Sequence, residues 1–140
     1  MKELVIADTG PLVAFLNRRE RRHNWAREQF AQCRPPLLTC ESVLSEACFL
    51  LRDLHQGIDS LMELLHRQVL ALPFRLADEQ VAVDRLLKRY RDVPMSLADA
   101  CLVRMSEQLT HSAVLTLDRD FRLYRKDGRK IISVLMPPEA

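Results

Sequence analysis

Residues 4–12 read LVIADTGPL, which places four apolar residues directly before an aspartate, a threonine, a glycine and a proline. A short apolar run of this kind predicts a buried β-strand over residues 4–7. The glycine and proline predict a helix after it, because proline is tolerated in the first turn of a helix. Residues 113–118 read AVLTLD and repeat the pattern of an apolar run that ends on an aspartate. We therefore predict two parallel strands of one sheet, each followed by an acid.

Strand-like and helix-like segments alternate along the rest of the chain. Apolar runs predict further strands at about 37–39, 69–72 and 131–135. Helical spacing of apolar residues predicts helices at about 22–33, 41–54, 58–68, 78–90 and 96–109. In the helix over 78–90 we expect Val81, Leu86 and Leu87 to face the core, and we expect Ser96 to cap the next helix. This alternation predicts an α/β fold with a parallel sheet that is covered on both faces.

Length and composition fit one globular domain over residues 1–140, with 48% hydrophobic residues. Only three glycines occur, which excludes a glycine-rich phosphate loop. The four cysteines form no CxxC pair, and we expect buried thiols. The sequence shows neither a signal peptide nor an apolar run long enough to span a membrane, so we expect a reducing, cytoplasmic location.

Basic residues gather in two stretches, although the net charge is only +2. The first stretch holds Arg18, Arg19, Arg21 and Arg22, and the second holds Arg119, Arg122, Arg125, Lys126, Arg129 and Lys130. Both could contact a polyanion, although charge runs are usually solvated surface charge.

The two strand-end aspartates, Asp8 and Asp118, point to an acidic site. Ligands of open α/β sheets bind outside the carboxyl ends of the strands. Carboxylates that crowd together repel each other unless a cation neutralises them. Oxygen ligands suit hard cations, so the pattern predicts a site for Mg²⁺ or Mn²⁺. A turn or cap role for either aspartate is an equally open alternative.

Two further acids lie among apolar residues of predicted helices. Glu46 has Val43, Phe49 and Leu50 as helical neighbours and no cation within a turn, so it is expected to need a partner from elsewhere in the fold. Asp99 lies in the first turn of its helix among small and apolar residues. The alternatives are a solvent-facing or ion-paired Glu46, and an Asp99 that only complements the helix dipole.

Other polar residues near these acids carry weaker expectations. Asp120 is expected to cap the turn after Asp118 or to bind metal at the rim. Thr9, Ser96 and Thr116 could orient carboxylates or satisfy backbone groups. The four histidines show no HExxH spacing, which argues against a zinc hydrolase.

Four short motifs, taken in order, resemble those of PIN-domain ribonucleases, and more narrowly the VapC type of bacterial toxin. They are DTGPLVA (8–14), LSEA (44–47), PMSLADA (94–100) and LTLDRDF (115–121). The resemblance implies a three-layer α/β/α fold and a Mg²⁺- or Mn²⁺-dependent endoribonuclease. Carried onto this chain, the acidic quartet of the family falls on Asp8, Glu46, Asp99 and Asp118, as catalytic and metal-binding residues. Ser96 stands where relatives often have an acid. The resemblance therefore leaves open whether the site binds one metal ion or two.

The resemblance also implies a homodimer that a cognate antitoxin neutralises, with RNA as the substrate. The resulting hypothesis is metal-assisted hydrolysis of RNA phosphodiester bonds. A non-catalytic RNA- or protein-binding module on the same fold is the alternative, because fold does not fix function. A phosphoacceptor receiver domain is disfavoured, since the chain lacks a paired acidic cluster at the first strand.

Overall fold

A computed structural model describes residues 3–138, so both ends of the predicted domain, 1–2 and 139–140, lie outside the described residues. The α-helices of this range are α1 (Thr9–Leu16), α2 (His23–Gln32), α3 (Glu41–Leu50), α4 (Gly57–His66), α5 (Gln80–Arg89) and α6 (Leu97–Gln108). The strands are β1 (Leu4–Ala7), β2 (Leu37–Leu38), β3 (Leu70–Ala71), β4 (Ser112–Leu115), β5 (Arg125–Lys126), β6 (Lys130–Ile131) and β7 (Val134–Leu135). Two short 3₁₀ helices are η1 (Leu76–Asp78) and η2 (Arg119–Arg122).

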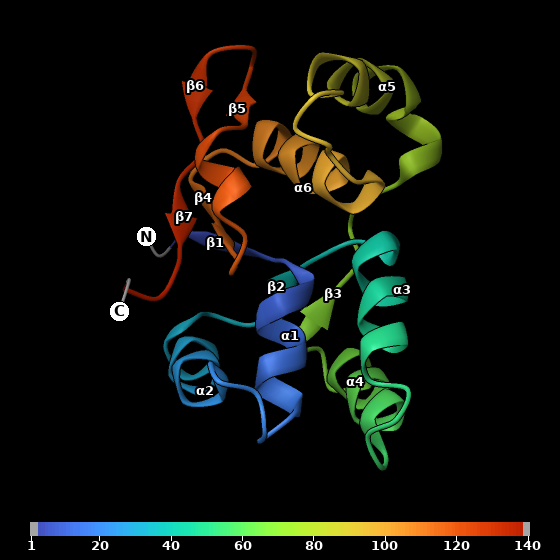
Figure 1. Ribbon diagram of the computed structural model, residues 1–140, viewed down its shortest axis with the longest axis vertical. Coiled ribbons are helices and arrows are strands. Elements are labelled where there is room, and N and C mark those ends of the chain that lie inside the picture. The colour runs from blue at the N-terminus through green and yellow to red at the C-terminus, as the bar shows by residue number, and fades with distance from the viewer. Residues whose placement is uncertain (1–2, 139–140) are drawn as a thin grey trace.

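A five-stranded parallel sheet in the order β3-β2-β1-β4-β7 forms the centre of the fold (Figure 1). The predicted strand pair β1 and β4 lies at its middle, with Ile6 opposite Val114. Because the two strands are parallel, both carboxyl ends open on the same edge of the sheet. With the six α-helices of residues 3–138, this sheet forms the three-layer α/β/α arrangement that the family resemblance implies.

The core is built from the sheet and from the helices that pack on it. Val5, Ile6 and Ala7 of β1 are buried, and so is every residue of β4. Strands buried on both faces read as continuous apolar runs, which explains why these two were visible in the sequence. Helix α6 packs against β1 and β4 and contributes the fully buried Leu102 and Val103.

The prediction of a single strand over residues 131–135 is wrong. Ile131 belongs to the antiparallel hairpin β5–β6 and is 73% exposed, whereas only β7 joins the parallel sheet. Asp127 and Gly128 form the hairpin turn with φ values of 51° and 82°. Glycine reaches this left-handed region at no steric cost, and aspartate tolerates it, so the pair reverses the chain.

The prediction that Val81 faces the core is also wrong, since Val81 is 73% exposed. The buried stripe of α5 consists of Val83 and Leu86 and continues into Tyr90, at the spacing of one helical face. Val81 lies two residues before Val83 and therefore points about 200° away around the helix. Helix α3 ends at Leu50 rather than near residue 54, and the chain continues in turns.

No helix within residues 3–138 is long and apolar enough to cross a membrane.

Candidate functional site

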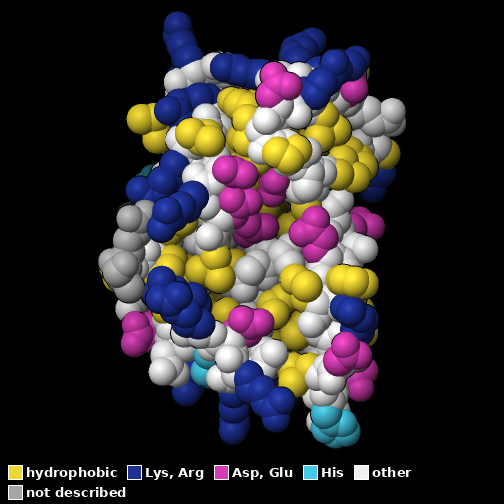
Figure 2. Space-filling model, in the orientation of Figure 1, with side chains coloured by type: hydrophobic (Ala, Val, Ile, Leu, Met, Phe, Trp, Pro, Cys, Tyr) yellow, Lys and Arg dark blue, Asp and Glu magenta, His cyan; other side chains and the backbone are white. Residues whose placement is uncertain are grey.

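A cavity of about 450 Å³ lies at the carboxyl edge of the sheet and brings the four predicted acids together. Figure 2 shows a cluster of acidic side chains near the middle of this face. The lining residues are Asp8, Thr9, Gly10, Glu46, Leu50, Ser96, Asp99, Leu117 and Asp118, and we call this cavity the acidic pocket. The acids arrive from the position directly after β1, from α3, from α6 and from the loop after β4, so the tertiary fold alone makes them neighbours.

Asp8 is the most deeply buried of the four acids, at 7% exposed. It is the N-cap of α1, and its Oδ1 accepts a hydrogen bond from the Thr9 amide at 2.7 Å. Its Oδ2 accepts one from the Thr116 hydroxyl, also at 2.7 Å. Burial, together with smaller contributions from the charges of Asp99 and Asp118, raises the pKa of Asp8 to about 6, although these two hydrogen bonds lower it.

Asp99 is fixed at the start of α6 by a reciprocal capping box. The Ser96 hydroxyl accepts from the Asp99 amide at 3.0 Å, and the Ser96 amide donates to Asp99 Oδ2 at 3.2 Å. The predicted cap is thus confirmed. Burial raises the pKa of Asp99, and the nearby charge of Asp118 adds to the increase.

Tyr124 is a site residue that the sequence did not reveal. Its hydroxyl donates to Asp99 Oδ2 at 3.2 Å, and its side chain is fully buried against Phe121 and Tyr90. Burial and the charge of Asp99 raise the pKa of Tyr124, so the phenol stays a hydrogen-bond donor. The residue lies within a basic stretch, where no local pattern separates it from surface residues.

The sequence predicts that Asp118 follows the strand directly. This prediction is wrong, because β4 ends at Leu115. It is the N-cap of η2, and its Oδ1 accepts from the Asp120 amide at 2.9 Å. The cap role that we expected for Asp120 therefore belongs to Asp118, and Asp120 does not line the acidic pocket. Thr116 links the two strand ends, since its hydroxyl donates to Asp8 and accepts from the Asp118 amide at 2.9 Å.

Glu46 reaches the acidic pocket from α3. Its Oε2 accepts from the Thr9 hydroxyl at 3.0 Å. Of its three apolar helical neighbours, Val43 is buried, whereas Phe49 and Leu50 are exposed. Glu46 itself is exposed, so solvent reaches its carboxylate.

The donor set fits a hard divalent cation, although the carboxylates are not yet arranged around one point. Within residues 3–138 no group of three or more His, Cys, Asp or Glu side chains is positioned to hold a metal ion. Each acid instead accepts hydrogen bonds from protein donors. However, a buried carboxylate whose pKa two further acids raise is an arrangement that a cation would relieve. All four side chains offer oxygen, the ligand atom that Mg²⁺ and Mn²⁺ prefer.

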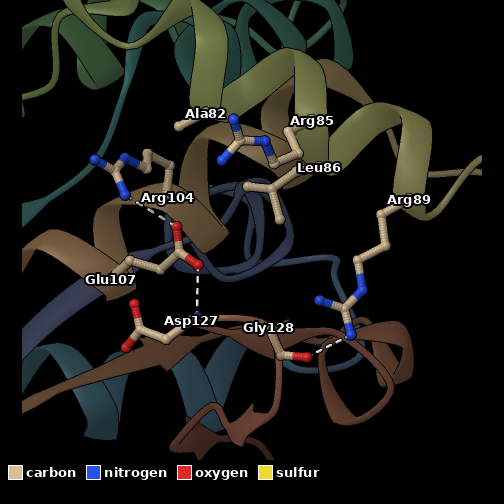
Figure 3. A pocket seen from close by; sticks show the side chains of 8 residues that line it. All are labelled: Ala82, Arg85, Leu86, Arg89, Arg104, Glu107, Asp127 and Gly128. Atoms are coloured by element: carbon tan, nitrogen blue, oxygen red, sulfur yellow. Dashed lines mark hydrogen bonds and ion pairs between the residues drawn. The ribbon is translucent and has the colours of Figure 1, made fainter.

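A second cavity, of about 350 Å³, lies between α5, α6 and the β5–β6 hairpin (Figure 3). Glu107 Oε2 accepts from the Asp127 amide at 2.7 Å, and Arg89 donates to the Gly128 carbonyl. Arg104 bonds Glu107 at 3.2 Å and Glu79 at 2.7 Å. The charged side chains around this second cavity largely pair with one another or with the turn of the β5–β6 hairpin. We call this cavity the seam, because these contacts fix the hairpin to α5 and α6.

Comparisons with known proteins agree with this architecture. The PIN domain family model matches residues 5–127. A solved structure, the Mycobacterium tuberculosis VapC20 toxin, described as cleaving the sarcin–ricin loop, is similar with a TM-score of 0.67 and 24% identity. The similarity covers 74% of this chain and 82% of that chain, and it concerns the fold. The search of curated proteins gave no significant match. Because the family match spans most of the sequence and the structure has the corresponding sheet, this chain belongs to the PIN-domain family.

Proposed function

We propose that this protein is a Mg²⁺- or Mn²⁺-dependent endoribonuclease whose active site is the acidic pocket. One observation carries the proposal: Asp8, Glu46, Asp99 and Asp118 come from four separate elements and line one cavity at the carboxyl edge of the sheet. Membership of the PIN-domain family supports nuclease chemistry at this place.

The proposed roles follow from the environment of each acid. Asp8, Asp99 and Asp118 would hold a divalent cation, and Glu46 would complete the set from the solvent side. A bound ion would supply positive charge to a phosphodiester and make an attacking water more acidic. Thr116 and Thr9 orient Asp8 and Glu46, while Ser96 and Tyr124 hold Asp99. These donors limit the rotation of the carboxylates and so prepare the ligand set.

The alternative function is a non-catalytic RNA- or protein-binding module. It is favoured by the fact that no three acids of residues 3–138 are positioned around one point as they stand. The two functions differ in a direct way. A nuclease requires the acids to bind metal and cut RNA, whereas a binding module needs neither.

Asp99→Asn tests the proposal. The amide keeps the size of the side chain and one acceptor oxygen but removes the charge, so we expect loss of Mn²⁺-dependent RNA cleavage with the fold retained. Glu41→Gln is the matched control, because Glu41 is an exposed acid at the start of α3 that does not line the acidic pocket. Cleavage by purified Asp99→Asn at the wild-type rate would refute the site assignment.

We further propose that the protein is the toxin of a type II toxin–antitoxin pair, works in the cytoplasm as a homodimer and is neutralised by a cognate antitoxin. The structural likeness to the VapC20 toxin supports this proposal. A reading frame for a small DNA-binding protein beside the gene, whose product suppresses both RNA cleavage and growth arrest, is the expected result. Cleavage that such a neighbour leaves unchanged would favour an isolated RNA-processing enzyme.

A further inference from the structure

The two basic stretches of the sequence meet in one cavity. Arg21 and Arg22 precede α2, and Arg119 and Arg122 belong to η2, almost one hundred residues later. Together with Leu117, Met136 and Pro137 they line a cavity of about 290 Å³, which we call the arginine pocket. Among residues 3–138, no acidic residue lines it.

The arginine pocket adjoins the acidic pocket. Leu117 lines both cavities, so the two meet at this residue. The η2 segment also connects the two, because Asp118 caps it and Arg119 and Arg122 lie within it. Figure 2 shows Lys and Arg side chains along one side of the acidic cluster.

The charges of Arg21, Arg22 and Arg122 in the arginine pocket favour an anion. Guanidinium groups stay charged at any physiological pH, so like charges gather at this cavity. Arg122 Nε contacts the sulfur of Met136 at 3.5 Å, and a thioether is only a weak acceptor. Arg21 and Arg122 are exposed, so solvent and ligands can reach them. Planar guanidinium forks match phosphate oxygens and bind them through paired hydrogen bonds.

We propose that the arginine pocket binds a backbone phosphate of the RNA strand that is cut at the acidic pocket. The inference rests on the proposed function and adds a direction to it: the strand crosses Leu117 and extends from the acids toward η2. A substrate too short to reach the arginine pocket is bound more weakly. The pocket recognises phosphate rather than base, so it contributes affinity and register but no sequence preference.

The test measures binding without cleavage. Full-length protein in EDTA is titrated against a fluorescein-labelled single-stranded RNA of about 12 nucleotides at several salt concentrations, because phosphate contacts appear in the salt dependence of the dissociation constant. Arg21→Gln/Arg122→Gln is compared with Arg34→Gln/Arg91→Gln. The control pair removes the same charge from exposed arginines that line neither pocket. Circular dichroism checks that both variants fold.

We expect the pocket variant to bind at least about tenfold more weakly and to show a shallower salt slope by about 1 to 1.5, with the control pair near wild type. Equal weakening of both variants, wild-type binding by the pocket variant, or no binding by the wild type would overturn the inference. So would stronger competition by poly-glutamate than by inorganic pyrophosphate, which would assign the pocket to an acidic peptide.

A separate cleavage assay with Mn²⁺ distinguishes the two proposals. If the wild type binds RNA through the arginine pocket but does not cut it, the nuclease proposal fails and the phosphate site stands. If the wild type cuts RNA and the pocket variant binds and cuts like wild type, only the phosphate site fails.

Discussion

Asp8 combines three roles in one side chain: it caps α1, accepts the Thr116 hydroxyl and lies in the acidic pocket. The first two are structural roles that need no charge: an asparagine also caps a helix, and its amide nitrogen would meet the Thr116 hydroxyl as a donor instead of an acceptor. The third places a negative charge in a buried position beside two other acids. The residue therefore carries an electrostatic cost that its structural roles do not require, which is typical of functional sites.

The pH dependence of stability measures this cost in metal-free protein. The pKa of Asp8 is about 6 in the folded state and near its usual value when unfolded, so the folded state binds the proton more tightly. Its contribution to the free energy of unfolding is thus fully present below pH about 4 and is lost as the pH rises through about 6. Asp8→Asn should remove this loss and gain on the order of 2 kcal/mol over wild type at pH 7.5.

Urea unfolding in EDTA, at about six pH values between 4 and 8, checks this prediction. Asp92→Asn, at an exposed aspartate outside the acidic pocket, serves as control. A difference between Asp8→Asn and wild type that stays constant with pH would contradict the prediction. Addition of Mg²⁺ should stabilise wild type at pH 7.5 and leave Asp8→Asn unchanged.

Thr116 offers a second residue-scale test, because its hydroxyl joins Asp8 to the Asp118 amide. Thr116→Val keeps the shape of the side chain. It should lower the free energy of unfolding by about 1 kcal/mol and lower the Mn²⁺ affinity, measured by calorimetry, about tenfold. Thr39→Val is the control, since that buried hydroxyl donates to the Ala7 carbonyl and contacts no carboxylate. Equal losses of Mn²⁺ affinity in the two variants would argue against an orienting role for Thr116.

At the scale of elements, capping positions most of the acidic pocket. Asp8, Ser96 and Asp118 each cap the helix that follows them, and the capping box of α6 fixes Asp99. The structural roles that were the alternatives to function for these acids are therefore present, and they do not exclude a functional role. Carboxylates that satisfy helix amides also line the cavity, so helix starts determine where these carboxylates lie.

The β5–β6 hairpin gives a prediction about an element that the sequence misjudged. Glu107→Ala removes the acceptor of the Asp127 amide, so hydrogen exchange at the turn should accelerate at least about tenfold while the sheet stays protected. Glu79→Ala is the control, because it removes the other partner of Arg104 without touching the hairpin. Unchanged exchange at Asp127 in the Glu107 variant would show that the seam does not hold the turn.

At the scale of the whole molecule, the exposed side chains of α3 lie beside the site. Phe49 is 61% exposed and Leu50 55%, and Leu50 also lines the acidic pocket. Exposed apolar side chains next to a functional cavity are typical of contact surfaces. The proposed homodimer gives them a partner.

Phe49→Asp tests that use of the surface. If the C-terminal end of α3 contributes to a homodimer, a charge at Phe49 should raise the dimer dissociation constant about tenfold and shift the sedimentation profile toward monomer, because an unpaired charge is costly to bury. Val81→Asp, at an equally exposed apolar residue of α5, should leave the profile unchanged. Equal effects of the two substitutions, or none from Phe49→Asp, would place the interface elsewhere.

The sequence predicts best where one segment carries its own signal. The strands β1 and β4 are recognisable because burial on both faces makes them continuously apolar. The Ser96 cap is local and is confirmed. Predictions that need the helix phase or the chain path were weaker: Val81 points outward, Ile131 belongs to a hairpin, and Asp118 caps η2 instead of following the strand directly.

The sequence by itself determined the alternating elements, the parallel sheet and the four acids as candidates, because periodicity, caps and apolar runs are local properties of the chain. Only the tertiary structure decided that Glu46 reaches the acidic pocket from an exposed helix, that Tyr124 bonds Asp99, and that two distant groups of arginines form one cavity. The physical reason is that contacts between residues far apart in sequence depend on how whole elements pack, and no local pattern of side chains encodes that packing.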